Sequence, residues 1–221
     1  SDDKLKVYDG EKIDCGDITA VGDAADGDIL TYSLDTEMTE PGSVTNAITY
    51  SVTKADGTDN SLNYNFILNE GTLTIAKRAL NIKSLSATKT YDGTPLEKQD
   101  YELIESTVAD GHTLTVTFLN SLTDAGTIDN EFSILVKDAD ENDVTSNYEL
   151  IPEYGTLTVE KQTLTITTLS ASKTYDGTPL TSEGYTITDG VIADGEELVV
   201  SGSYASLLDA GEKDNSFSYM I

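Results

Sequence analysis

Tryptophan is absent from this 221-residue sequence, and cysteine and histidine occur only once each. A single cysteine, Cys15, excludes a disulfide within the chain. No apolar run approaches the roughly 18 residues that a membrane-spanning helix needs, and the N-terminal residues SDDKLKVYDG do not have the form of a signal peptide. We therefore expect no insertion into a membrane. Any export signal or anchor is expected to lie outside these residues.

Basic residues are also scarce, with 13 lysines and arginines against 40 aspartates and glutamates, for a net charge of −27. Nucleic-acid backbones and anionic membrane surfaces repel such a chain, so neither is a predicted partner. The acidic residues are scattered and not gathered in one block, which is untypical of a disordered tail. The charge favours solubility in an exposed setting and limits self-association, so we expect a monomer.

What the chain does contain is a repeat of about 84 residues. The phrase SLSATKTYDGTPL at 84–96 returns as TLSASKTYDGTPL at 168–180, and a weaker form, KVYDGEKI, occupies 6–13. The repeated turn residues are Tyr8, Asp9, Gly10, Tyr91, Asp92, Gly93, Tyr175, Asp176 and Gly177. An Ala-Asp-Gly triplet recurs in the same register, starting at residues 25, 109 and 193. Several anchors in one register exclude chance similarity.

These anchors predict three successive repeats, 1–78, 79–162 and 163–221. The middle repeat is complete. The first has an incomplete first strand, and the third lacks the Asn-Tyr strand and the closing Gly-Thr-Leu-Thr strand of the second. We therefore expect this chain to be part of a longer array in which the flanking repeats are partners. The junctions, TLTIAKRALNI and TLTVEKQTLTI, leave almost no linker.

The predicted strands follow period two. In TLTVTFL, Leu114, Val116 and Phe118 alternate with threonines, which suit the wet face of a sheet. Aspartate-glycine pairs supply turns, and no stretch has the period of an amphipathic helix. Repeat 2 is predicted to form six or seven short strands. The fold class is therefore all-β, as tandem small Ig-like β-sandwich modules in an extended array, with β-grasp-like modules as the alternative.

The combination of Lys89–Leu96, Asn147-Tyr148 and Gly155–Val159, repeated in part at Lys173–Leu180, resembles the YDG and MBG-type repeats of large bacterial cell-surface, adhesin-like proteins. Repeat 1 departs from the pattern, with Glu-Lys-Ile in place of Thr-Pro-Leu. The resemblance implies an extracellular location, on the surface or cell wall of a bacterium that we expect to be Gram-positive. It implies a role in building repeats and supplies no ligand.

Repetition predicts a structural spacer or stalk that projects a functional domain from the cell wall. The alternative is an adhesive module that binds a host glycan, mucin or matrix protein. For that alternative, the first place to look is the segment Ile13–Asp23, which diverges most from its counterpart at 96–108. A third candidate, an accessory domain of an enzyme, stays open.

No catalytic residue is predicted. His112, the only histidine, follows an Asp-Gly pair and is expected to be an exposed turn residue. Cys15 has lysine and serine in its place in the other repeats, so a reactive thiol is not expected. No nucleophile elbow, phosphate-binding loop or metalloprotease motif occurs. No cofactor is predicted apart from the calcium considered next.

Calcium is the one metal that the sequence suggests. Residues Asp138, Asp140, Asn142 and Asp143 place oxygen ligands near alternating positions, as at the start of an EF-hand loop. The glycine at the sixth position and the glutamate at the twelfth position are missing. The competing interpretation is an ordinary hairpin loop between two strands.

Two further ideas attach to the repeated residues. The repeated lysine and asparagine invite a Lys–Asn isopeptide bond, which needs the two side chains adjacent in the core; the residues are Lys6, Lys89, Lys173, Asn46, Asn130 and Asn215. The repeated tyrosine is either a platform for sugar stacking or a structural residue that hydrogen-bonds backbone. A position shared by every repeat favours the structural role.

Overall fold

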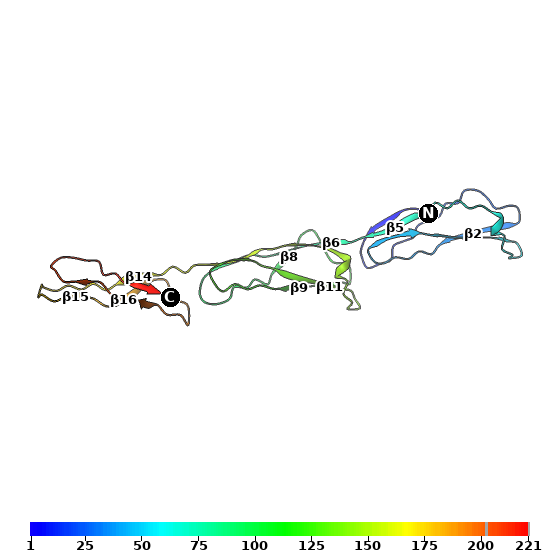
Figure 1. Cartoon of the computed structure of the whole chain (residues 1–221). Coiled ribbons are helices and arrows are strands. Elements are labelled where there is room, and N and C mark those ends of the chain that lie inside the picture. Colours follow the sequence, from blue (N-terminus) through cyan, green and yellow to red (C-terminus); the bar gives the residue numbers. More distant parts are fainter. Residues whose placement is uncertain (202, 221) are drawn as a thin grey trace. The chain divides into compact units, whose positions relative to one another are not determined.

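The computed structural model describes residues 1–201 and 203–220, without the side chains of 200, 201, 219 and 220. Over these residues the chain is all-β and has no α-helix (Figure 1). Its only helical elements are two 3-10 turns, η1 (Ser61–Asn63) and η2 (Thr145–Asn147). By its contacts the chain divides into two compact units. Unit 1 comprises Ser1–Lys83, Tyr101–Thr117 and Phe132–Glu153; unit 2 comprises Ser84–Asp100, Phe118–Glu131 and Tyr154–Ile221.

The two units do not coincide with the three repeats that the sequence period predicts. Part of repeat 2 belongs to unit 1 with repeat 1, and the rest belongs to unit 2 with repeat 3. The repeat boundaries 1–78, 79–162 and 163–221 stay a prediction. Eight strands, β6 to β13, fall in or at the edge of repeat 2, against the six or seven expected.

Unit 1 contains small open sheets with both parallel and antiparallel pairs. Strand β5 (Gly71–Ala76) pairs in parallel with β1 (Lys4–Val7) and antiparallel with β3 (Gly42–Asn46). Strand β6 (Arg78–Ser84) pairs in parallel with β12 (Tyr148–Glu153) and lies between it and β8 (Tyr101–Leu103). Two antiparallel pairs complete the unit: β2 (Asp28–Leu34) with β4 (Ile48–Lys54), and β9 (Thr113–Phe118) with β11 (Phe132–Lys137).

Unit 2 follows the same plan with shorter strands. Strand β13 (Thr156–Glu160) pairs in parallel with β7 (Ala87–Thr90) and antiparallel with β10 (Gly126–Asp129). Three antiparallel pairs follow: β14 (Thr165–Thr168) with β16 (Tyr185–Asp189), β15 (Leu180–Thr181) with β18 (Ser206–Leu207), and β17 (Val199–Ser201) with β19 (Ser218–Met220).

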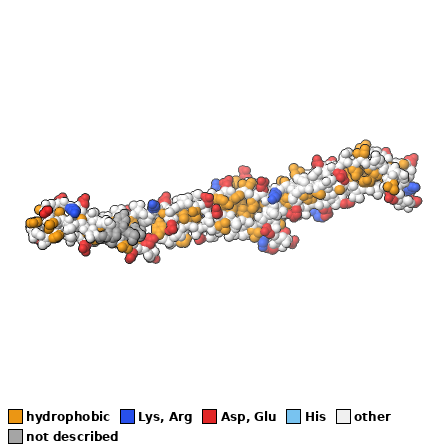
Figure 2. Space-filling model, viewed as in Figure 1, with side chains coloured by type: hydrophobic (Ala, Val, Ile, Leu, Met, Phe, Trp, Pro, Cys, Tyr) orange, Lys and Arg blue, Asp and Glu red, His pale blue; other side chains and the backbone are white. Residues whose placement is uncertain are grey.

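The predicted alternation of side chains is confirmed. In β9 every threonine is exposed while Leu114, Val116 and Phe118 are half-buried. In β5, Leu73 and Ile75 are fully buried, and in β6 so are Leu80 and Ile82. The cores are small, which is expected where a module of about 84 residues must bury apolar side chains from short strands. Acidic side chains are scattered over the face that Figure 2 shows, with apolar side chains between them.

Candidate functional site: the repeated turns

Each Tyr-Asp-Gly turn is held by the lysine that lies three positions before its aspartate. The Nζ–Oδ1 distances are 2.7 Å for Lys6–Asp9, 2.6 Å for Lys89–Asp92 and 2.8 Å for Lys173–Asp176. Each aspartate also accepts the backbone N–H two residues later, at Glu11, Thr94 and Thr178. The glycines have φ near +80°, the left-handed region that other residues rarely adopt. The lysines therefore pair with aspartates, and their contacts do not include the asparagines that an isopeptide bond requires.

The lysine changes the titration of these turns. Hydrogen bonds to the carboxylate hold the pKa of Asp92 well below its usual range. The hydrogen bond from Lys89 has the largest effect, and those from Thr94 come next. The Lys173 side chain and Thr178 act in the same way on the pKa of Asp176. The charged form of each aspartate is thus favoured in the folded chain.

We expect Asp92→Asn to lower the melting temperature at neutral pH, with the difference from wild type shrinking in acid. Because the pKa of Asp92 is lower in the folded chain than in the unfolded chain, the charged carboxylate stabilises the fold at pH values above the unfolded-state pKa of about 4. This stabilisation is lost as the pH falls below about 4 toward the folded-state pKa. Thermal unfolding followed by circular dichroism from pH 7 to pH 2.5 measures it. Asp209→Asn, an exposed residue of the same unit, controls for net charge. A difference that stays constant over this range would contradict the assignment.

The tyrosines of the three turns differ sharply in their surroundings. Tyr8 is 3% exposed, whereas Tyr175 is 63% exposed. The ring of Tyr8 lies edge-on to Tyr148 and His112, with both centroid distances 5.8 Å. Burial raises the pKa of Tyr8, and the side chain of Asn147 hydrogen-bonds to it. A residue of repeat 1 is therefore buried by residues of repeat 2.

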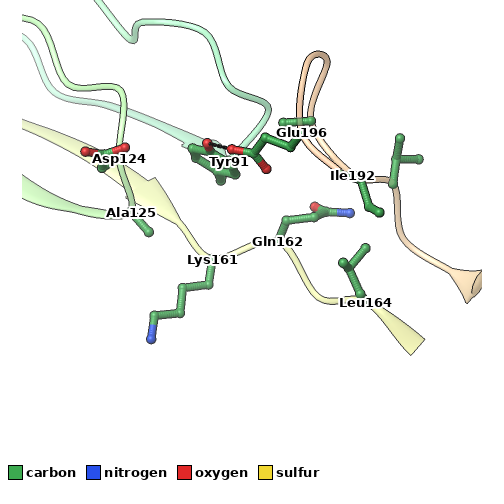
Figure 3. A pocket seen from close by; sticks show the side chains of 10 residues that line it. Tyr91, Asp124, Ala125, Lys161, Gln162, Leu164, Ile192 and Glu196 are labelled. Carbon is green, nitrogen blue, oxygen red and sulfur yellow. Dashed lines mark hydrogen bonds between the residues drawn. The ribbon is translucent and has the colours of Figure 1, made fainter. Parts of the chain in front are cut away.

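Tyr91 makes the corresponding contact in unit 2. Its hydroxyl donates to the carboxylate of Glu196, and this hydrogen bond raises the pKa of Tyr91 (Figure 3). A cavity of about 300 Å³ lies beside this contact, with Gln162 and Leu164 in its lining. Here a residue of repeat 2 meets a residue of repeat 3.

The Ala-Asp-Gly turns supply the other half of each contact. His112 donates its backbone N–H to the carbonyl of Ala109, and Glu196 does the same to Ala193. In unit 1 the hydroxyl oxygen of Tyr148 accepts the N–H of Ala109 at 3.0 Å and lies 2.8 Å from Nδ1 of His112. The turn at 109–112 is thereby tied to the body of its own repeat.

The expectation that His112 is an exposed turn residue is wrong. The side chain is half-buried, since its ring packs against Tyr8 and is held by the Tyr148 hydroxyl. Exposure was expected from the neighbouring Asp-Gly pair alone. The residues that bury the ring, Tyr8 and Tyr148, are distant in sequence and could not be inferred from that pair. Aspartate stands at the equivalent place in repeat 1, where Asp28 accepts a hydrogen bond of 2.6 Å from Tyr64.

The space around the glycines of the Tyr-Asp-Gly turns gives independent evidence for the same contacts between turns. A Cβ at Gly10 would lie 3.1 Å from the His112 ring, and a Cβ at Gly93 would lie 3.1 Å from Cβ of Ala193. A Cβ at Gly177 would meet nothing within 4 Å. The first two Tyr-Asp-Gly turns therefore each lie against the Ala-Asp-Gly turn of the repeat that follows, and the third is open.

The repeated asparagines bind backbone. Asn46 donates to the carbonyl of Cys15 at 2.8 Å. Asn130 donates to Leu85 and Lys98 at 2.9 and 2.8 Å, and Asn215 donates to Leu169 and Ser182 at 2.9 and 2.8 Å. Cys15, Lys98 and Ser182 are aligned in the repeats and share this role through their carbonyl groups. Their side chains are thus free to vary, which explains why a cysteine is tolerated there.

A serine that sequence reasoning missed completes this arrangement. The hydroxyl of Ser84 donates to the Asn130 carbonyl at 2.7 Å and accepts the N–H of Gly155 at 3.0 Å. Ser1 makes the same two contacts, with Asn46 and Gly71. The repeat spacing from Ser1 to Ser84 was the available signal.

The predicted calcium ligands lie in the hairpin turn after β11. The Asp138 carboxylate accepts the backbone N–H groups of Asp140 and Asn142, both at 2.9 Å. Hydrogen bonding from Asn142 lowers the pKa of Asp138. Asp143 accepts from the N–H of Thr145. Among the described residues no three His, Cys, Asp or Glu side chains form a group that holds a metal; the hairpin's own donors account for these two carboxylates.

No protein-family model matches the chain, and neither a curated protein nor a solved structure matches it. Over the described residues, no helix is long and apolar enough to span a membrane.

Proposed function

We propose that the chain is a structural spacer of a bacterial cell-surface protein, a series of repeats that holds a functional domain away from the cell wall. The observation that carries the proposal is the recurring contact between a Tyr-Asp-Gly turn and the Ala-Asp-Gly turn of the next repeat. It occurs at Tyr8 with His112 in unit 1 and at Tyr91 with Glu196 in unit 2.

A spacer needs joints that resist bending, and these contacts supply them. A flexible Gly/Ser linker would let neighbouring modules move independently, whereas here the junction from β5 to β6 is a single residue, Lys77. Arg78 adds a tie across the joint, since its guanidinium donates to the Tyr8 carbonyl at 3.4 Å and to the Thr107 carbonyl at 2.6 Å. The strand content and small sheets are consistent with Ig-like modules, which we propose as the fold of each repeat.

The net charge of −27 supports an exposed setting, because like-charged chains avoid edge-to-edge strand pairing. The adhesive alternative requires a ligand site made from these repeats. The exposed Tyr175, at 63%, is the residue to test for sugar stacking. The burial of Tyr8 supports a structural role for the tyrosine of the first turn.

Small-angle X-ray scattering of the intact chain tests the spacer. A compact chain of this length has a radius of gyration of about 17 Å, and an extended series of three modules about twice that. We expect the larger value in chelator and the same value after millimolar calcium is added, because Asp138 and Asp143 already accept hydrogen bonds within their own hairpin. A value near 17 Å would refute the spacer, and lengthening only in calcium would make the metal a structural partner.

A further inference from the structure

The first strands of repeat 2 run parallel to its last strands. Strand β6 pairs with β12 over six positions, and β7 pairs with β13 over four. In both pairs each residue is in register with the residue 70 positions further along the chain, as Leu80 is with Leu150. Residues 78–90 and their partners 148–160 therefore form one series in a single register, which we call the parallel ladder.

Serine hydroxyls continue this pairing where the strands are interrupted. The hydroxyl of Ser84 accepts the backbone N–H of Gly155 at 3.0 Å. The hydroxyl of Ser86 accepts the backbone N–H of Thr156 at 2.9 Å. The parallel ladder therefore has hydrogen bonds in the gap between its two strand pairs as well as within them.

Repeat 1 has the same arrangement, since β1 pairs in parallel with β5. The N–H of Tyr8 donates to the carbonyl of Ala76 at 2.9 Å, directly beyond these strands. In repeat 2 the N–H of Tyr91 donates to the carbonyl of Glu160 at 2.8 Å. In both repeats the Tyr-Asp-Gly turn thus begins where a first strand is bound to the last strand of its own repeat.

The chain enters and leaves the parallel ladder at opposite ends. Lys77 is the single residue between β5 and β6, and Lys161 directly follows β13. Because the paired strands are parallel, a pull on Lys77 and Lys161 acts at the N-terminal end of one strand and at the C-terminal end of the other. The strands are then pulled past each other along their length, so their evenly spaced hydrogen bonds share the load.

We propose that the parallel ladder is the mechanical clamp of the repeat, the element whose rupture sets the force at which the repeat unfolds. Tension along the array crosses from β6 and β7 to β12 and β13 through its hydrogen bonds. Residues 91–147, which include β8 to β11, lie between its two halves in the sequence and carry no tension until it breaks. The inference deepens the proposed spacer and rests on it for the origin of the tension.

Single-molecule force spectroscopy of the intact chain, held at two cysteines, tests the clamp by changing only the direction of the pull. Cys15→Ser removes the native thiol, and repeat 3 has Ser182 at the equivalent position. Lys77→Cys with Lys161→Cys loads the ladder along its strands. Lys77→Cys with Glu149→Cys pulls the same strands apart from one end. The three residues replaced by these cysteines are exposed, so both variants are expected to keep the wild-type midpoint in chemical denaturation.

We expect the rupture force along the strands to be at least about twofold higher than the force from one end at the same loading rate. Forced unfolding is governed by the unfolding barrier, and shearing must break several hydrogen bonds together. Each rupture is identified by its gain in length, at most about 3.6 Å for each residue between the two cysteines. Equal rupture forces in the two directions would overturn the proposal.

A proline substitution tests the hydrogen bonds themselves. Asn81 directs its N–H to Ser106 and its carbonyl to the N–H of Ile104, both toward β8. The N–H of Ile151, which is in register with Asn81, therefore faces β6. Ile151→Pro removes this donor and is expected to lower the rupture force along the strands by at least about one fifth. Ile151→Thr keeps the donor and strand propensity, and is expected to change the force by less than about one tenth. Equal losses in the two variants would contradict the clamp.

Scattering separates failure of the clamp from failure of the spacer. An extended chain whose rupture forces are equal in the two directions would refute the clamp and keep the spacer. A radius of gyration near the compact value of about 17 Å, together with a high ratio of rupture forces, would refute the spacer and keep the mechanical role of the ladder.

Discussion

Tyr8→Ala is expected to lower the free energy of unfolding of unit 1 by about 3–5 kcal/mol, the cost typical of removing a buried aromatic ring. The ring is 3% exposed and packs against Tyr148 and His112, so its loss leaves a cavity between two repeats. It also removes the hydrogen bond with Asn147. The effect is expected at the joint because Tyr8 belongs to repeat 1, whereas the His112 and Tyr148 rings that pack against it belong to repeat 2.

The same substitution at the equivalent position of repeat 3 is the matched control. Tyr175 is 63% exposed, so Tyr175→Ala is expected to change the free energy of unfolding by less than about 0.5 kcal/mol. Because the chain divides into two units, a single global transition is not assumed. Native-state hydrogen exchange of the buried core amides, Leu73 and Ile75 for unit 1 and Leu157 for unit 2, reports each unit by itself. Equal effects of the two variants would show that the contact with the next repeat contributes nothing.

Asn130→Ala is the second substitution with a large expected effect, about 2–4 kcal/mol in unit 2. The side chain is fully buried and supplies the hydrogen bonds that the Leu85 and Lys98 carbonyl groups accept from it. These acceptors are half-buried, and leaving them without donors costs about 1–2 kcal/mol each. Chemical denaturation followed by circular dichroism measures the change.

Asn130→Asp separates hydrogen bonding from shape. A carboxylate has nearly the same size but directs oxygen at both carbonyl groups, so at neutral pH we expect a loss at least as large as that of alanine. Protonation restores one donor, and the loss is therefore expected to shrink in acid. Asn65→Ala, at an exposed position, controls for removal of a surface amide. An Asn130→Ala variant as stable as this control would refute the role of Asn130.

The sequence by itself determined the all-β class and the alternation of buried and exposed side chains. Period two is a local property: successive side chains of a strand point to opposite faces whatever lies beyond them. That is why Leu73, Ile75 and the threonines of β9 lie as predicted. The repeat register was also available from sequence, and equivalent positions make equivalent contacts, as the lysine–aspartate pairs do.

Only the tertiary structure decided what the repeated residues touch. Tyr8, Tyr91 and Tyr175 are each followed by Asp-Gly, yet their exposure differs because burial depends on residues about 100 positions away, such as His112 and Glu196. The pairing of β6 with β12 and its place beside β8 likewise join segments that are distant in the sequence. Hydrophobic period specifies which face of a strand is buried; which segment buries it depends on long-range packing, and local pattern does not encode that.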